Sequence, residues 1–391
     1  MLFLLHKYST MNRYLNILIP GIFLPTCLGT VYNFSQYSMD LQTLFGISKF
    51  ATDIGFTLII FFLGMCAACF GRQVELNPKK MSIVSTILFA IGMFSMFIST
   101  FFGILPLYYV ACSFMGAGTG IGYVCPIKQL LSNFEDHKGL ASGLAITGFG
   151  LGKFVAAPAI EFLLGTVALP YMFLILCGAF LFIMMMCNLL FKPNPAYVST
   201  IYTAVPIMTL KNAVFLTKQY ISVWLMFCIN ISCGLAIISQ EKSLLLGLGF
   251  KEIATIMSLT AVFNILGRFL MSALSDKIGR KAAYHYVCSF GIIASFLCFT
   301  QISWLALIGI LLVEYAYGGN FSCLPSLLAK RFGSTSVSTV HAMTLSGWAV
   351  AGIIGPTLAN LITGNTLYLV LGCLYLVGFS LMEIFVKKDK E

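Results

Sequence analysis

Gly122-Tyr-Val-Cys-Pro126 has a counterpart far along the chain, Phe321-Ser-Cys-Leu-Pro325, and each is followed a few residues later by a lysine. The two stretches fall in the fourth and the tenth long apolar segments, which are equivalent places if the chain consists of two similar halves. A second set of matching positions lies in the fifth and eleventh segments, where Gly148, Pro158 and Gly165 correspond to Gly347, Pro356 and Gly364. The repeat therefore predicts a duplicated architecture.

The composition indicates that both halves lie in a membrane. Hydrophobic residues make up 59% of the 391 residues, charged residues make up 9%, and the mean hydropathy is +0.95, whereas a soluble domain is about one quarter charged. A helix needs about 20 apolar residues to span a bilayer. We expect an all-α membrane protein with twelve transmembrane helices in two six-helix halves, near residues 14–37, 50–70, 80–102, 105–132, 138–163, 169–191, 218–246, 252–274, 282–300, 303–331, 336–361 and 365–386.

A proline-containing segment between two long apolar segments divides the chain near its middle. Residues 192–217 contain Pro193, Pro195 and Pro206, and we interpret them as a cytoplasmic linker between an N-terminal half, residues 1–191, and a C-terminal half, residues 218–391. In transporters built from such repeats, the binding site lies between the halves near the membrane midplane. Small residues in Gly116-Ala-Gly-Thr-Gly-Ile-Gly122 would let neighbouring helices approach closely.

The charge distribution predicts the orientation of the chain. A net charge of +10 could suggest a nucleic-acid partner, but the basic residues cluster on alternate loops, and only Lys49, Lys242 and Lys251 fall on the opposite side. The positive-inside rule then places both termini in the cytoplasm. The first apolar segment has no small-residue cleavage site, so we expect a retained helix after a short tail at residues 1–12. A plasma membrane or a bacterial inner membrane would suit this pattern.

Motifs for metal binding and for catalysis are missing from the sequence. Nearly all of the thirteen cysteines fall in apolar segments, the four histidines are scattered, and no CxxC is paired with a second CxxC or with histidines. There is no GxSxG, no HExxH and no Walker-type glycine-rich loop. We therefore expect no cofactor, no metal site and no enzymatic activity.

The segment between the expected eighth and ninth helices resembles a known signature. Ser272-Ala-Leu-Ser-Asp276-Lys277-Ile-Gly279-Arg280-Lys281 is similar to the loop motif of the major facilitator superfamily, although Ser272 stands where that family usually has glycine. The resemblance implies a conformational latch made by Asp276, Lys277 and Arg280. The equivalent stretch after the second helix, residues 71–80, is degraded, so we expect no full latch there.

Further fragments narrow the resemblance to one family within that superfamily. Gly120-Ile-Gly-Tyr-Val-Cys-Pro126, Phe134 to Gly143, Gly148 to Gly152, Tyr32 to Tyr37, Asn264 to Arg268 and Gly318 to Pro325 are together similar to the oxalate/formate antiporter family and to the related monocarboxylate transporters. This implies a carrier for small carboxylates that works by alternating access and functions as a monomer.

Arg268 is the strongest candidate for binding an anion. A charged side chain at membrane depth costs several kcal/mol, so it needs a wet cavity, a partner or a function. The guanidinium fork fits a carboxylate with two hydrogen bonds, and the resemblance places the family's substrate-binding arginine at this position. The alternative is a salt bridge to another helix.

Lys153, Glu314 and Asn264 are further polar residues at membrane depth. Lys153 would act as a second substrate cation or pair with an internal acid, and we leave both open. The oxalate carriers resembled here take their second cation from the eleventh helix, where this chain has Trp348. Glu314 would balance Lys153 or Arg268, or take up a proton. Asn264 stands where proton-coupled monocarboxylate carriers have an aspartate, which argues against proton symport.

Aromatic residues complete the predicted site. Tyr32, Tyr123, Tyr317 and Phe321 match family positions that wall off the substrate, and tyrosine hydroxyls can donate to a carboxylate. The leading hypothesis is exchange of small mono- or dicarboxylates such as formate, oxalate, lactate or pyruvate. The alternatives are a proton-coupled monocarboxylate symporter and a non-transporting nutrient sensor on the same fold.

Overall fold

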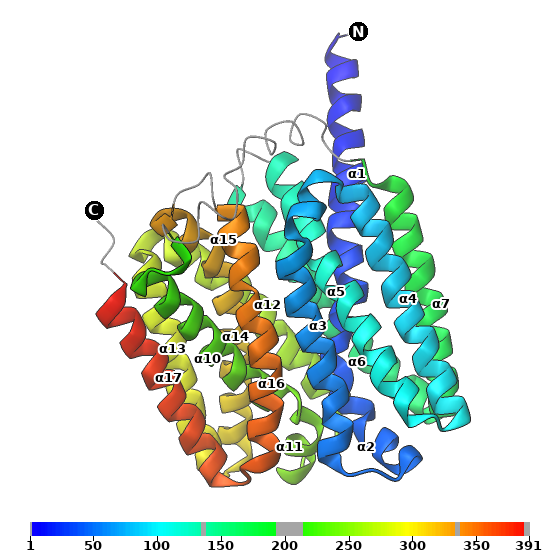
Figure 1. Cartoon of the computed structure of the whole chain (residues 1–391), viewed down its shortest axis with the longest axis vertical. Coiled ribbons are helices and arrows are strands. Elements are labelled where there is room, and N and C mark those ends of the chain that lie inside the picture. Colours follow the sequence, from blue (N-terminus) through cyan, green and yellow to red (C-terminus); the bar gives the residue numbers. More distant parts are fainter. Residues whose placement is uncertain (1, 134–137, 193–213, 333–336, 387–391) are drawn as a thin grey trace.

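The structure, a computed structural model, describes the backbone of residues 2–133, 138–192, 214–332 and 337–386, and their side chains except at 2–15, 75, 127–145 and 337–338. Every regular element in this part of the chain is a helix (Figure 1). The first set comprises α1 (Leu2–Gly29), η1 (Thr30–Asn33), α2 (Phe34–Phe45), α3 (Lys49–Leu76), α4 (Pro78–Phe102), α5 (Leu105–Asn133), α6 (Lys138–Thr166) and α7 (Leu169–Leu190). The second set comprises α10 (Lys218–Ile238), α11 (Glu241–Gly247), α12 (Ile253–Ile278), α13 (Arg280–Phe299), α14 (Ser303–Phe332), α15 (Val337–Thr344), α16 (Ser346–Leu361) and α17 (Asn365–Phe385).

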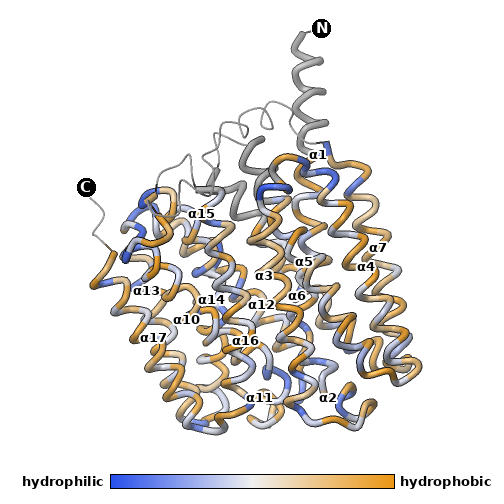
Figure 2. The backbone as a smooth tube through the Cα atoms, viewed as in Figure 1, coloured by the Kyte–Doolittle hydropathy of each residue, from blue (hydrophilic) through white to orange (hydrophobic). Residues whose placement is uncertain are grey.

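The outside of the bundle is apolar. Eleven helical segments among the described residues are long and apolar enough to cross a membrane; α5, which has 29 residues, is not one of the eleven. Figure 2 shows hydrophobic residues along the outer helices, and the most exposed include Phe162, Trp304, Leu361 and Ile384. So large an apolar surface is unfavourable in water and suits a lipid environment. The expected all-helical membrane fold is therefore confirmed, with eleven rather than twelve candidate spans among the described residues.

The two sets of helices lie on different sides of the bundle. In Figure 1 the first set is on the right, coloured blue to green, and the second set is on the left, coloured green to red. They meet where α6 packs against α12 and where α3 packs against α16. The start of α1 and the end of α17 both lie toward the upper end of the view. One face of α6 and one face of α12 therefore lie at the junction between the sets.

Three expected segments differ from the helices observed. The segment 14–37 belongs to a longer unit, because α1 already begins at Leu2 and the chain continues through η1 and α2 to Phe45. The segment 218–246 is divided into α10 and α11 by Ser239 and Gln240, and the segment 336–361 is divided at Leu345. Hydropathy detects an apolar run but not a change of backbone direction within it, so these breaks were missed.

The η1 turn lies where α1 touches α6 most closely. A Cβ added at Gly29 would stand 2.2 Å from the carbonyl oxygen of Phe149, and one added at Gly152 would stand 2.3 Å from that of Thr26. Only glycine permits two helix backbones to lie this close together. The Asn33 amide then reaches α6 and donates a hydrogen bond to the Lys153 carbonyl oxygen, 3.3 Å away. The close contact thus brings η1 to the junction between the two sets.

Glycines of α5 make a similar contact with α3, as expected from the small residues at 116–122. A Cβ added at Gly120 would stand 2.2 Å from the Leu63 carbonyl oxygen, whereas one added at Gly165 on α6 would meet nothing within 4 Å. Because a backbone carbonyl cannot move away alone, Gly120→Ala should destabilise the protein by about 1–3 kcal/mol. Thermal unfolding in detergent checks this, with Gly165→Ala as the matched control. Equal stability of the two variants would contradict the close contact.

Candidate functional site

Arg268 lies in α12 with its side chain turned into the protein. Only 1% of its surface is exposed. Its Nε donates to Asn264 Oδ1 at 2.8 Å, and one terminal nitrogen, Nη1, donates to the Ile146 carbonyl oxygen at 3.0 Å. The Phe321 ring centre lies 5.6 Å from the guanidinium carbon. No described carboxylate lies at ion-pair distance, so the described groups in direct contact with this buried cation are neutral.

The predicted aromatic residues gather around Arg268 and are joined by Trp348. The Tyr32 and Tyr317 hydroxyl oxygens are 3.1 Å apart. Phe321 packs against Tyr317 and Trp348 with ring centres 5.2 and 4.5 Å apart, and Tyr123 lies 5.2 Å from Trp348. All five rings are buried. The structure therefore brings Tyr32, Tyr123, Tyr317 and Phe321 together.

Two polar groups in this aromatic cluster have no hydrogen-bond partner in the described part of the chain. The Tyr123 hydroxyl and Trp348 Nε1 are buried without a hydrogen bond to any described group. A buried donor left unpaired costs about 1–3 kcal/mol. Trp348 is the residue of this cluster that the predicted site omitted, because its role depends on a contact with α5 that no local pattern reveals.

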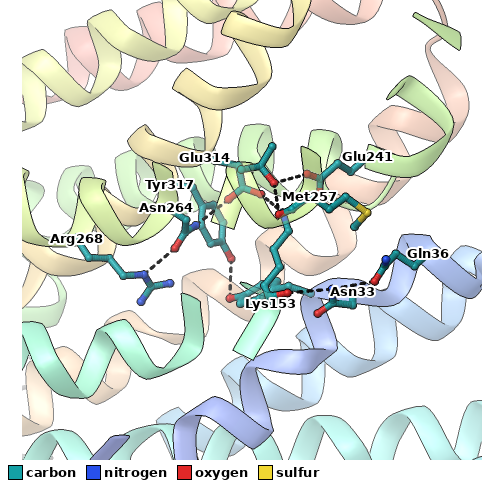
Figure 3. Close-up of polar contacts among 11 residues, drawn as sticks. Asn33, Gln36, Lys153, Glu241, Met257, Asn264, Arg268, Glu314 and Tyr317 are labelled. Carbon is teal, nitrogen blue, oxygen red and sulfur yellow. Dashed lines mark hydrogen bonds and ion pairs between the residues drawn. The ribbon is translucent and has the colours of Figure 1, made fainter. Parts of the chain in front are cut away.

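Lys153 lies in α6 and forms ion pairs with two acids of the second set of helices (Figure 3). Its Nζ is 2.6 Å from Glu241 Oε2 and donates a short hydrogen bond to Glu314 Oε1. Glu314 Oε2 accepts a hydrogen bond from Asn264 Nδ2 at 2.8 Å. Asn264 therefore connects this ion cluster to Arg268, because its oxygen is the acceptor for Arg268 Nε.

Glu241 is a residue of the ion cluster that the predicted site missed. It is fully buried at the start of α11. The polar run Gln240-Glu241-Lys242 inside the apolar segment 218–246 was the available signal. A single helix over residues 218–246 would leave Glu241 near its outer end. The break at Ser239 and Gln240 turns the carboxylate inward instead.

A second group of polar contacts joins the two sets of helices at the end of the bundle near α2 and α11. Asp53 on α3 accepts hydrogen bonds from Gln240 at 2.7 Å and from Asn360 on α16 at 2.8 Å. Lys242 donates to the Gln36 carbonyl oxygen at 2.5 Å. These contacts link the two sets of helices at this end.

The predicted latch residues lie at the junction of α12 and α13, away from Arg268. Asp276 and Arg280 form an ion pair within this junction, and Arg280 also donates to Ser275 Oγ. Lys277 is exposed beside them. Among the described residues no group of three His, Cys, Asp or Glu side chains could hold a metal ion.

Comparison with known protein families gives a consistent result. A family model described as Major Facilitator Superfamily matches residues 18–356 and, in a second match, residues 221–391. The chain is 25% identical over 351 residues to an uncharacterized MFS-type transporter, YhjX, of Escherichia coli (strain K12), covering 86% of this chain and 85% of that protein. It is 24% identical to an oxalate:formate antiporter of Oxalobacter formigenes, covering 96% and 92%.

Other matches concern a human transporter and a solved structure. The chain is 23% identical over 294 residues to monocarboxylate transporter 12 of Homo sapiens, covering 64% of this chain and 57% of that protein. It superposes on a partially occluded inward-open conformation of the xylose transporter XylE from E. coli with a TM-score of 0.74 and 15% identity, covering 95% of this chain and 99% of that one. At that identity the superposition bears on the fold alone.

Proposed function

This chain belongs to the Major Facilitator Superfamily, and from that premise we propose that it is a secondary-active transporter that exchanges small organic anions by alternating access. The family and the fold are those of multi-pass membrane transporters rather than enzymes. We further propose that the carried anions are mono- or dicarboxylates such as formate, oxalate, lactate or pyruvate, and that Arg268 binds their carboxylate.

One observation supports this proposal most strongly: Arg268 is a buried cation with no described carboxylate at ion-pair distance. Removing a charge from water costs several kcal/mol unless an opposite charge or ample hydrogen bonding compensates it. Asn264 and the Ile146 carbonyl oxygen supply two acceptors but no negative charge. A carboxylate that approached the guanidinium would supply that charge and accept two hydrogen bonds.

The aromatic cluster supplies the other walls of the proposed site. Tyr123 and Trp348 hold donors that no described group accepts, and these donors would serve a second oxygen of the cargo. Phe321, whose ring centre lies 5.6 Å from the guanidinium carbon, would exclude water beside Arg268. Lys153 would contribute indirectly, since Glu241 and Glu314 already compensate its charge. The relatives described as an oxalate:formate antiporter and as a monocarboxylate transporter favour carboxylates as the cargo.

We also propose how the chain is arranged in the membrane. In this arrangement α5 is the twelfth spanning helix, both termini are cytoplasmic, and residues 192–217 connect an N-terminal half (1–191) to a C-terminal half (218–391). The protein would function as a monomer without a cofactor in a plasma membrane or bacterial inner membrane. Release of the Asp53 contacts with Gln240 and Asn360 would open the end near α2 and α11, while Asp276, Lys277 and Arg280 would latch the other end.

Transport by the purified protein in liposomes tests this proposal. Vesicles preloaded with unlabelled formate, oxalate, lactate or pyruvate should take up the same labelled anion from outside, and the rate should saturate with concentration. Empty vesicles, which contain no counter-anion, are the control for exchange. Vesicles preloaded with xylose are the control for sugar transport. Failure of all four anions to exchange, with the protein folded, would refute the assignment of the cargo.

A further inference from the structure

Asn264 lies between two charged side chains and contacts both through its amide group. Figure 3 shows Glu314 of α14 joined by hydrogen bonds to Asn264 and then to Arg268, both of α12. Asn264 Nδ2 donates to Glu314 Oε2 at 2.8 Å, and Asn264 Oδ1 accepts from Arg268 Nε at 2.8 Å. All three residues are at most 5% exposed. Because an amide has a donor end and an acceptor end, its direction determines which neighbour each end can satisfy.

Glu314 determines the direction of this amide. Lys153 Nζ donates a short hydrogen bond to Glu314 Oε1, and Asn264 Nδ2 donates to Oε2, so each carboxylate oxygen faces a donor. An ionised carboxylate only accepts hydrogen bonds. The nitrogen of the Asn264 amide must therefore face Glu314, and its oxygen must face Arg268. A reversed amide would place an oxygen against the Glu314 carboxylate and a nitrogen against Arg268 Nε.

Helix packing and an ion pair keep the Glu314 carboxylate beside Asn264. Gly318 lies one turn after Glu314 on α14, where the backbones of α12 and α14 approach closely. A Cβ added at Gly318 would stand 2.1 Å from the Asn264 carbonyl oxygen and 3.2 Å from Arg268 Cγ. On its other side the Glu314 carboxylate is paired with the ammonium group of Lys153. Glu314 therefore has little freedom to move away from Asn264.

The contact with Asn264 leaves one edge of the Arg268 guanidinium for a cargo. A guanidinium can offer a carboxylate two parallel N–H groups from Nε and one terminal nitrogen, or from its two terminal nitrogens. Asn264 Oδ1 already occupies Nε, which excludes the first of these edges. Nη1 has two hydrogens and donates one to the Ile146 carbonyl oxygen at 3.0 Å, and Nη2 has no hydrogen-bond partner among the described groups. The edge that remains is the end edge, formed by Nη1 and Nη2.

We propose that Glu314 is a positioning residue for the binding of cargo, and that it acts on Arg268 through Asn264. By fixing the Asn264 amide, Glu314 keeps Arg268 Nε engaged and directs the end edge of the guanidinium toward the carboxylate. The inference rests on the proposed binding of a carboxylate by Arg268. Neither Glu314 nor Asn264 needs to touch the cargo in this arrangement.

Glu314→Gln should reverse the Asn264 amide. The glutamine oxygen would stay with the Lys153 ammonium, which is a donor, so the glutamine nitrogen would face Asn264. Asn264 would then turn its oxygen toward residue 314 and its nitrogen toward Arg268 Nε. Two donors would oppose each other there, and Arg268 would leave the orientation that presents its end edge. We expect KM for the exchanged anion to rise at least about tenfold, the factor that corresponds to the loss of one hydrogen bond to a charged group.

The sign of this change separates positioning from simple electrostatics. Glu314→Gln removes a negative charge near Arg268, and that removal alone would strengthen the attraction for an anion and lower KM. Glu241→Gln is the matched variant, because Glu241 belongs to the same ion cluster but accepts a hydrogen bond from Thr260 rather than from Asn264. We therefore expect Glu241→Gln to leave KM unchanged or lower, whereas Glu314→Gln raises it.

KM and the maximal rate of exchange in preloaded liposomes test the proposal. The labelled anion is the one among formate, oxalate, lactate and pyruvate that the wild type exchanges fastest. A purely structural defect would reduce the amount of active protein, and so the maximal rate, without changing KM. A KM for Glu314→Gln equal to or below the wild-type value would overturn the positioning role and leave the transport function intact. Failure of the wild type to exchange any of the four anions would overturn both.

Asn264→Leu tests the route from Glu314 to Arg268. Leucine has nearly the size of asparagine but makes neither contact of the amide, so this variant should also raise KM about tenfold. Adding Glu314→Gln to it should raise KM no further, because a residue that acts only through Asn264 has no effect once the amide is gone. A second rise of similar size in the double variant would mean that Glu314 reaches Arg268 by another route, and would refute the proposal. If Glu314→Gln does not fold, an unchanged KM in Asn264→Leu would refute it equally.

Discussion

Arg268→Lys should reduce carboxylate exchange by at least about tenfold while leaving the protein folded. The guanidinium can donate two parallel hydrogen bonds to one carboxylate, whereas an ammonium group is a point charge that cannot reproduce this fork. A hydrogen bond to a charged group contributes about 1.5–3 kcal/mol, and about 1.4 kcal/mol corresponds to a factor of ten. Because lysine keeps the positive charge, a loss of exchange would show that the hydrogen-bond geometry of the guanidinium is required.

Exchange of labelled anion in proteoliposomes measures the effect of Arg268→Lys. Arg72→Lys is a matched control, because Arg72 is exposed on α3 and lies outside the proposed site. Circular dichroism and thermal unfolding verify that both variants are folded. If Arg268→Lys exchanged anions as fast as the wild type, Arg268 would not bind the carboxylate.

Lys153→Met should destabilise the protein by about 3–5 kcal/mol, because it leaves two buried carboxylates without their cation. The variant Lys153→Met/Glu241→Gln/Glu314→Gln should recover most of that loss, since replacing a whole buried ion cluster with neutral groups is often tolerated. The transport rate of Lys153→Met should fall by the same factor for monoanions and for dianions, because Lys153 is already paired with acids.

Thermal unfolding in detergent measures the stability of these variants. Lys251→Met, which replaces an exposed lysine, controls for the loss of a positive charge. A Lys153→Met variant as stable as the wild type would show that the ion pairs are unimportant for folding. Selective loss of dianion transport would instead return Lys153 to the role of a second substrate cation.

Much of the fold follows from the sequence because membrane helices are defined by local composition. A segment of about 20 apolar residues has few alternatives in a bilayer, where each backbone polar group must be paired within the segment. The break between α10 and α11 could not be anticipated in the same way. Ser239 and Gln240 begin a short polar run inside a mostly apolar segment, and their conformation depends on the contact of Gln240 with Asp53 on another helix.

The candidate site was predictable where charge alone identifies a residue. Arg268 and Lys153 stand out because charged groups are rare at membrane depth. Their partners were not predictable, because Lys153 reaches Glu314 across 161 positions of the chain and Tyr32 reaches Tyr317 across 285. Glu241 was missed because its inward direction depends on the break before α11. The contacts of a site between two sets of helices are set by packing, which a single sequence does not encode locally.

The central claim is that the buried guanidinium of Arg268 receives a carboxylate. The most direct measurement is the thermal unfolding of the purified protein with increasing concentrations of a small carboxylate and, in parallel, of its uncharged methyl ester. At a ligand concentration of 100 times Kd, binding would stabilise the wild type by about 2.7 kcal/mol. The account predicts a saturable rise in unfolding temperature with the carboxylate alone, and little rise in Arg268→Lys. Equal stabilisation by the ester, or equal stabilisation of both proteins by the carboxylate, would contradict it.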